Sequence, residues 1–308
     1  MYFLYYLYNY LAWPITVVLA LAFIFLVIAM TLIRGYISPD SATEKKDFVQ
    51  VILVGLGAIV AVGSFLIAWS TLQQSQVSTQ ASLANSQEVA AQNAEADLLQ
   101  SYLEQMSSSL AQGLRTTPTE DEKMVARIQT LAVLRALEER DRKRLVVRFL
   151  SESNLINKDD PVVDIDSANL VRANLSYIGL SDTYLQHTLL NKAKLKMATL
   201  RRSNLQWAEL SGACLRNAGF KEANLYYTGL EDADLAGADL SGADLREAVG
   251  LTQEQINLAY GSAETKLPDR DDLTAPDTWS KSIEEQEEIL KDEIAQAPEA
   301  ENCIDKPI

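Results

Sequence analysis

The chain has 308 residues, of which 48% are hydrophobic, and a formal net charge of −15. Its single histidine excludes metal sites built on histidine pairs. Its two cysteines, Cys214 and Cys303, are too few for a disulfide framework, and one bridge between them is left open. Most of the negative charge is C-terminal, since residues 252–308 carry fifteen acidic and five basic side chains. Such acidic tails are usually solvated, so the net charge by itself does not indicate a binding site.

Two apolar segments dominate the first 69 residues. Residues 1–33 carry no charged side chain, and residues 11–33 alone are long enough to cross a bilayer core as a helix. A second apolar run covers residues 48–69. Because a backbone in lipid must satisfy its own hydrogen bonds, we predict a two-helix transmembrane hairpin over residues 1–69. The alternative is a buried helical hairpin in a soluble protein.

Basic residues near the two spans bear on their orientation. The loop at residues 34–47 holds Arg34, Lys45 and Lys46, whereas neither the N-terminus nor residues 70–114 hold any Lys or Arg. The positive-inside rule then places the loop in the cytoplasm and both termini outside. Because the bias is only three residues, the sequence leaves the side of the soluble domain open.

Residues 70–117 are predicted as a helical stalk and residues 118–162 as a helical hairpin. Thr119 and Glu122 form a capping box at the start of the hairpin. Between its two helices, the charge run Glu139–Arg144 is either a solvated turn or a contact for lipid headgroups or an acidic partner. The residues expected on buried helix faces are Leu99, Tyr102, Leu103, Met106, Leu110, Leu114, Val125, Ile128, Leu131, Leu134, Leu137, Leu145, Val146, Phe149 and Leu150.

From Leu170 to Leu245 every fifth residue is large and apolar. Fifteen of these sixteen positions are Leu, and the residue two places earlier is small everywhere except at Ile178. A period of five fits neither a helix nor a strand, and a fixed period with buried positions indicates a solenoid. The predicted solenoid core is Leu170, Leu175, Leu180, Leu185, Leu190, Leu195, Leu200, Leu205, Leu210, Leu215, Phe220, Leu225, Leu230, Leu235, Leu240 and Leu245.

The repeated unit, Ala-(Asp/Asn)-Leu-x-x, resembles that of the pentapeptide-repeat family over residues 163–251. The resemblance implies an all-β fold, a right-handed quadrilateral β-helix with four units and twenty residues per coil. Residues 250–268 resemble a common ending of such repeats, with Thr252 and Gln255 as a capping box. Residues 252–308 are therefore expected to form a capping helix and a mobile acidic tail. The helical segments would cover the two ends of the β-helix, whose unpaired edges otherwise invite aggregation.

Residues twenty apart stack on one outer face of such a coil. His187, Trp207 and Tyr227 form one column, and Tyr184 and Tyr226 lie on the same face. Aromatic rings dominate many interface hot spots, so these five residues are the candidate interaction face. The alternatives are a stacking ladder that stabilises the solenoid, or a surface covered by the helical segment.

Charge varies along the predicted solenoid. Residues 183–202 carry basic side chains and no acidic ones, whereas residues 223–242 carry acidic side chains and no basic ones. We expect Asp234, Asp239 and Asp244 to face solvent as parts of an acidic belt. The two belts serve either solvation or salt-sensitive binding of a partner. The basic belt consists of Lys192, Lys194, Lys196, Arg201 and Arg202.

The sequence shows no phosphate loop, paired-acid site, metal cluster or nucleophile motif, so we expect no enzyme activity, no cofactor and no metal. We expect a membrane-anchored scaffold or protein-interaction module. Its expected partners are the lipid bilayer and unidentified proteins, with a homo-oligomer left open. The first alternative is an accessory or regulatory subunit of a membrane transporter or complex.

The family resemblance adds two further expectations. Some pentapeptide-repeat proteins mimic DNA and inhibit topoisomerases, which requires strong negative charge along the solenoid. Residues 163–251 carry eleven acidic and nine basic side chains, so this alternative is less favoured and no nucleic-acid partner is expected. The family is abundant in cyanobacteria, so the resemblance implies a bacterial inner or thylakoid membrane for the two-pass integral protein that the apolar segments predict.

Overall fold

The computed structural model describes residues 42–298 together with Met30 and Cys303. Contacts divide the chain into two compact units at Gln92, and each is treated separately below. The first predicted span, residues 11–33, lies outside the described residues except for Met30. The structure therefore does not test the prediction of this first span.

The second predicted span lies in helix α2, Ala42–Ala111. In the described part of the chain this is the one helix long and apolar enough to cross a membrane, with a mean hydropathy of 2.1 in its most apolar stretch. That stretch is not buried within the structure, and Phe65 and Ile67 are 65% and 68% exposed. The structure thus supports one candidate span, and it does not support the predicted pair.

The repeat region folds as a β-helix whose register is twenty residues per coil. Parallel bridges join Asn169 to Leu189, Leu189 to Glu209, Glu209 to Gly229 and Gly229 to Val249 along one side. In the described residues these bridges are isolated single pairs and no longer strand forms. The reason is geometric, because each five-residue side must include its own corner turn and leaves room for one bridge.

Each corner of the coil is a tight turn with a left-handed residue. The amide of Ala173 donates to the carbonyl of Leu170 at 3.0 Å, and Arg172 between them has φ 58°. The same conformation recurs at every corner, including Trp207 at φ 62°. A left-handed residue other than glycine costs roughly 1–2 kcal/mol. Because every corner has it, this conformation at Trp207 is a property of the fold and gives no indication of function.

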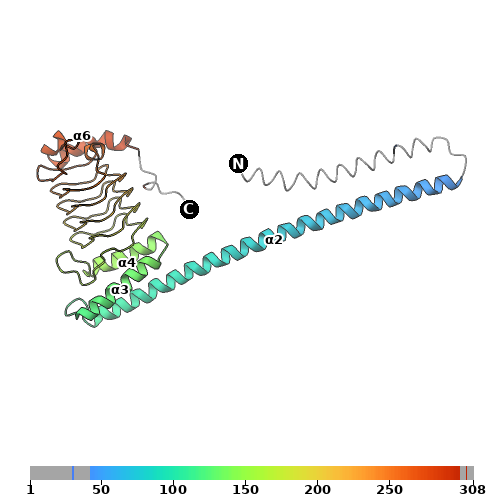
Figure 1. Cartoon of the computed structure of the whole chain (residues 1–308), viewed down its shortest axis with the longest axis horizontal. Helices are drawn as coiled ribbons and strands as arrows, with labels where there is room; N and C mark the ends of the chain where they lie inside the picture. The colour runs from blue at the N-terminus through green and yellow to red at the C-terminus, as the bar shows by residue number, and fades with distance from the viewer. Residues whose placement is uncertain (1–29, 31–41, 299–302, 304–308) are drawn as a thin grey trace. The chain divides into compact units, whose positions relative to one another are not determined.

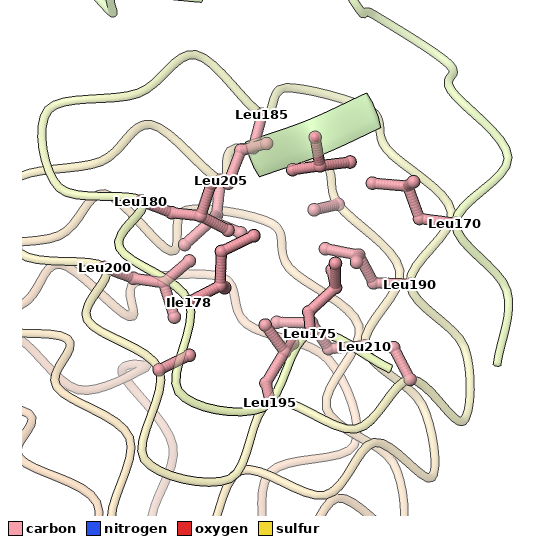
Figure 2. Packing of buried hydrophobic residues seen from close by; sticks show 14 of the residues in the cluster. Leu170, Leu175, Ile178, Leu180, Leu185, Leu190, Leu195, Leu200, Leu205 and Leu210 are labelled. Atoms are coloured by element: carbon pink, nitrogen blue, oxygen red, sulfur yellow. The ribbon is translucent and has the colours of Figure 1, made fainter. Parts of the chain in front are cut away.

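The interior holds one large and one small side chain from each unit. All sixteen predicted core residues are at most 2% exposed, and Figure 2 shows leucines of successive coils pointing into the same interior. The hydroxyls of Thr183, Thr188 and Ser203 donate to carbonyls three residues earlier, so these buried polar atoms are satisfied. Burying each leucine contributes about 1.5–3 kcal/mol relative to exposure.

Asp234, Asp239 and Asp244, each directly before a core leucine, form hydrogen bonds to the backbone. Asp239 Oδ1 accepts a hydrogen bond from the Ser241 amide at 2.9 Å, and Asp234 and Asp244 bond the backbone two residues ahead in the same way. These are Asx turns, in which a short side chain accepts from the following corner. All three residues are only partly exposed, so they help to form the corners and face solvent only in part.

Helices α3, Glu120–Ala136, and α4, Arg140–Glu152, lie at the N-terminal end of the coils (Figure 1). Within the β-helix, a carbonyl such as that of Leu189 accepts from the preceding coil. At the first coil, the carbonyls of Asn169 and Gly179 accept instead from Lys143 Nζ at 3.0 Å and Ser151 Oγ at 2.8 Å. The hairpin thus satisfies edge groups that would otherwise be open.

The buried face of α3 agrees only in part with the predicted one, since Leu134 and Leu137 are buried as predicted. Val125 and Ile128 are 52% and 59% exposed, and Leu145 of α4 is also exposed. The end of α2 packs instead against a neighbouring face, where the hydroxyls of Tyr102 and Thr130 are 2.8 Å apart. Burial raises the pKa of Tyr102 to about 12. The other buried residues of the α3 face are Ala126, Val133 and Leu134.

The charge run Glu139–Arg144 forms the start of α4, and it is solvated only at Glu139, Arg140 and Asp141, which are exposed. Lys143 is 5% exposed, and burial lowers its pKa. Arg142 forms ion pairs with Glu139 at 2.7 Å and with Glu95 of α2 at 3.0 Å. Glu95 also accepts from the amides of Glu138 and Glu139. The run therefore ties the hairpin to α2 and to the first coil.

The β-helix continues beyond the last regular repeat. Bridges join Asp239 to Tyr260 and Asp244 to Lys266, so a final, longer coil extends to Lys266. Helix α5, Gln253–Asn257, lies in this coil and begins with the predicted capping box. These bridges join residues more than twenty apart, because the coil holds one extra residue before Tyr260, in the stretch that contains α5, and another between Tyr260 and Lys266.

The segment after Lys266 is packed, so the prediction of a mobile tail is wrong for residues 267–298. A 3₁₀ helix, Asp277–Ser280, and helix α6, Ile283–Gln296, cover the last coil (Figure 1). Trp279 is buried and its indole donates to the Ala259 carbonyl at 3.0 Å. The buried side chain of Gln286 exchanges two hydrogen bonds with the backbone of Gly261.

Two further contacts hold the C-terminal segment on the side of the coils. The buried guanidinium of Arg216 donates to the carbonyls of Ile294, Ala297 and Pro298. Cys214 and Cys303 form a disulfide, so the bridge that the sequence left open is present. The partners in these two contacts lie about 80 to 90 residues earlier in the chain, which is why the sequence of the tail did not indicate order.

Gly261→Ala should weaken the C-terminal cap. A Cβ atom at this position would lie 2.3 Å from Trp279, whereas one at Gly179 would meet nothing nearer than 3.9 Å. Because overpacking of a tight core typically costs about 1–3 kcal/mol, we expect that loss for Gly261→Ala and a near-neutral effect for Gly179→Ala. Urea unfolding followed by circular dichroism measures both. Equal stabilities of the two variants would contradict the described cap.

Candidate interaction face

Corner residues twenty apart stack into columns, and one column is aromatic. The rings of His187 and Trp207 have centroids 6.2 Å apart and planes at 15°, and those of Trp207 and Tyr227 are 4.0 Å apart at 5°. Tyr226 meets Tyr227 edge-on at 4.6 Å, and the guanidinium of Arg246 is 5.7 Å from the Tyr226 centroid. Four of the five candidate residues therefore form one connected ring assembly.

The fifth candidate, Tyr184, belongs to a polar row beside the rings. Its hydroxyl donates to Gln186, whose amide donates to Gln206 at 3.2 Å. Partial burial, followed by the charges of Asp164 and Asp166, raises its pKa. The structure therefore places Tyr184 next to the aromatic column and gives it no described ring contact.

The aromatic column is only partly exposed. Trp207 is 43% exposed, and its two ring faces contact neighbouring rings, so mainly edges are available to a partner. At one end of the column, His187 Nδ1 lies 2.8 Å from Asp166 Oδ2. Burial raises the pKa of Asp166, but hydrogen bonds from Ser167 and His187 outweigh it and hold the pKa below its usual value. The rings can stabilise the solenoid by stacking and also bind a partner, because a ring that is already stacked loses little conformational entropy on binding.

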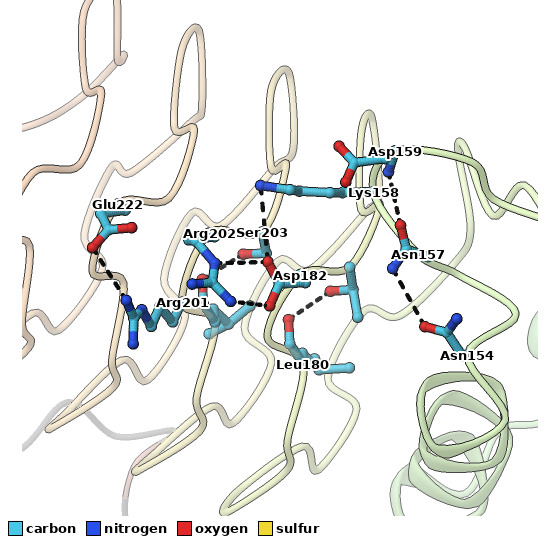
Figure 3. A network of polar contacts seen from close by, with 12 residues as sticks. Asn154, Asn157, Lys158, Asp159, Leu180, Asp182, Arg201, Arg202, Ser203 and Glu222 are labelled. Carbon is cyan, nitrogen blue, oxygen red and sulfur yellow. Dashed lines mark hydrogen bonds and ion pairs between the residues drawn. The ribbon is translucent and has the colours of Figure 1, made fainter.

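A neighbouring corner column is built from charges (Figure 3). Arg202 donates to both carboxylate oxygens of Asp182, at 2.8 and 2.6 Å, and Arg201 lies 3.4 Å from Glu222. The hydrogen bonds from Arg202 lower the pKa of Asp182. Two members of the predicted basic belt are thus neutralised by acids of adjoining coils. Pairing residues twenty apart would have found the Arg202–Asp182 contact from the sequence.

Two of the acids predicted to face solvent are paired in a similar way. Asp234 pairs with Arg216 at 2.8 Å, and both side chains are about nine-tenths buried. Asp244 pairs with Arg246 at 2.7 Å and with Lys266 at 3.5 Å. Among the described residues, no group of His, Cys, Asp and Glu is arranged to hold a metal ion. The outer surface therefore offers shape, ring edges and isolated charges.

The family model for pentapeptide repeats matches residues 168–206, 180–217 and 213–249, with eight copies of the repeat. These matches cover the coils that carry the five-residue register. Residues 168–249 therefore consist of pentapeptide repeats. Proteins of this family fold as right-handed β-helices, in agreement with the register and core of these coils. None of the curated proteins matches the chain significantly.

Several solved pentapeptide-repeat structures are similar. Rfr23 from the cyanobacterium Cyanothece 51142 is 25% identical, with 34% of this chain and 68% of that chain covered and a TM-score of 0.25. The alr5209 protein from Nostoc PCC 7120 is 28% identical, with 34% and 78% covered and a TM-score of 0.18. QnrB1, a plasmid-mediated fluoroquinolone resistance protein, is 15% identical, with 42% and 74% covered and a TM-score of 0.19. At these TM-scores the individual likenesses support no argument about function.

Proposed function

We propose that this pentapeptide-repeat protein is a membrane-anchored protein-interaction module or scaffold without catalytic activity. The observation that carries the proposal is the partly exposed Trp207 within a prestacked column of rings. Stacking fixes the ring positions before a partner arrives, so binding orders few additional side chains. Tryptophan and tyrosine are also the residue types most enriched in binding hot spots.

Helix α2 supports the membrane part of the proposal. Its apolar stretch is exposed in the described structure, and a surface of that size and character needs lipid or protein to cover it. We propose that residues 11–33 add a second span, because they are uncharged and long enough. The protein is then a two-pass protein of a bacterial inner or thylakoid membrane.

The disulfide supports an extracytoplasmic position for the β-helix. Cys214 and Cys303 are 0% and 4% exposed, so their bridge is a buried structural one. Disulfides of this kind form in the periplasm or another oxidising compartment and are rare in the cytosol. The positive charges of the loop at residues 34–47 independently favour a cytoplasmic loop and outer termini. Both observations favour the same side for the proposed position of the β-helix.

Two other functions are less well supported. A partner that is itself a membrane protein would make this chain an accessory or regulatory subunit of a transporter or complex. DNA mimicry needs an acidic surface, but Asp182, Asp234 and Asp244 are each paired with an arginine. We therefore propose protein recognition and not inhibition of a topoisomerase.

Trp207→Ala should abolish capture of the partner. After mild detergent extraction from the source membrane, tagged wild type should co-purify a specific protein, and the variant should lose it by roughly tenfold or more, as expected for a hot spot. Trp207→Phe should retain part of the binding because the ring stack is kept. Met197→Ala is the matched control, since Met197 is 48% exposed at a different corner.

Two outcomes would contradict this proposal. Capture of the same proteins by Trp207→Ala and by wild type would exclude the aromatic column as the docking face. Purification of the wild type as a lone homo-oligomer would exclude the accessory-subunit alternative and the proposed protein partner together.

Cys214 and Cys303 should be oxidised to a disulfide in the membranes of the cell. When a maleimide-polymer reagent is added to denatured membranes, the wild type should shift on a gel only after prior reduction, because the bridge leaves no thiol. Cys303→Ser is the control and should shift without reduction, through Cys214. A wild-type chain modified at both cysteines before reduction would place the β-helix in a reducing compartment.

A further inference from the structure

Helix α3 carries an apolar stripe on the side opposite its buried face. Met124, Val125 and Ile128 are 61%, 52% and 59% exposed, whereas Ala126 and Val133 on the other side are buried. Met124 and Val125 precede Ile128 by four and three residues, so the three side chains lie on one face of the helix. Single exposed apolar residues are normal on a protein surface, but a contiguous stripe on one helix face indicates a contact surface.

A charged residue ends the stripe on each side, and the two charges are of opposite sign. Asp121 lies in the first turn of α3 and Arg135 in the last, and both are exposed on the same face as Ile128. In the part of the chain that the structure describes, no other residue forms an ion pair with either of them. These charges also suit the dipole of α3 itself. The dipole does not account for the exposed apolar side chains between them.

The stripe is symmetric about Ile128. Three pairs of residues lie at equal distances on either side of it, seven, four and three positions away. They are Asp121 and Arg135, Met124 and Ala132, and Val125 and the half-buried Leu131. If two copies of α3 pack antiparallel with Ile128 opposite Ile128, the two members of each pair face one another. Every apolar side chain then meets an apolar one, and each Asp121 meets Arg135 of the other copy.

We propose that α3 is a self-association surface, on which two copies of this chain pack antiparallel about a twofold axis at Ile128. A twofold contact is isologous, so the surface that forms it must be complementary to itself. A parallel arrangement would instead place Asp121 against Asp121 and Arg135 against Arg135, and like charges so placed repel. Exposed ion pairs add little affinity, so the charges determine the direction of packing and the apolar stripe supplies the attraction.

The proposed contact is small. One pair of helices buries less surface than the roughly 1,200–2,000 Å² of stable complexes, so the dimer should dissociate on dilution below roughly micromolar concentrations. The contact uses none of the rings of the aromatic column. It therefore stands or falls separately from the binding of a partner at Trp207.

Cysteine cross-linking of the full chain in a mild detergent tests the proposal. The chain is held at roughly 50 µM, where a contact of this size is populated, and treated with a short bis-maleimide. The native cysteines form a disulfide and do not react. Ile128→Cys should give a cross-linked dimer, because the two copies of this residue meet on the axis. Val249→Cys is the control and should stay monomeric, since Val249 is 60% exposed on the last regular coil.

Two further sets of variants test the direction of packing. Asp121→Cys should not cross-link to itself, because its two copies are about 21 Å apart along antiparallel helices at 1.5 Å per residue. A mixture of Asp121→Cys and Arg135→Cys chains should cross-link. At low salt, adding Arg135→Glu to Ile128→Cys should reduce the cross-linked dimer at least threefold, because Glu then faces Asp121. Adding Asp121→Lys as well should restore the dimer, because the opposite charges face each other again.

Three results would overturn the proposal. The first is an Ile128→Cys dimer no more abundant than that of Val249→Cys, which would mean that detergent or another protein covers the stripe. The second is self-linking of Asp121→Cys, which would show a parallel contact. The third is a charge reversal that Asp121→Lys does not rescue. If a charge variant does not fold, as judged by circular dichroism, the mixture of Asp121→Cys and Arg135→Cys chains decides alone.

Discussion

Burial of one large and one small side chain in every five residues is the constraint on which the structure depends. The leucines at positions 170 to 245 fill the interior, and small residues two places earlier leave space for the chain to turn. The left-handed corner that follows each leucine is unfavourable by itself. It is tolerated because the turn returns the chain to the next buried leucine and because an Asx side chain bonds across it.

The same packing leaves the first and the last coil of the β-helix without a neighbouring coil on one side. A coil leaves its outermost carbonyls and its apolar cross-section open, and such edges promote aggregation. At one end Lys143 and Ser151 supply donors from α4. At the other, the final coil incorporates α5, and Trp279 and Gln286 close over Gly261. The helices on both sides of the repeats are therefore parts of the folded domain.

The regular part of this architecture could be predicted from the sequence. In a solenoid the length of the sequence repeat determines which residues lie above one another in successive coils. The core leucines and the column through Trp207 both follow from counting in fives and twenties. The packed face of α3 could be predicted only in part, at Leu134, because it also depends on where Tyr102 of α2 meets Thr130. The order of the C-terminal segment depends on Arg216 and Cys214, whose positions on the coil surface become known only from the fold.

Native-state hydrogen exchange of the oxidised full chain tests most directly whether the capped β-helix is one cooperative unit. The amides of Leu240 and Leu245, which donate to Tyr260 and Lys266 of the final coil, should exchange as slowly as that of Leu205 in the interior. The amide of Gly261, which donates to Gln286, should be similarly protected. Exchange of these three amides orders of magnitude faster than that of Leu205 would show that the repeats end at residue 251 without a structured cap.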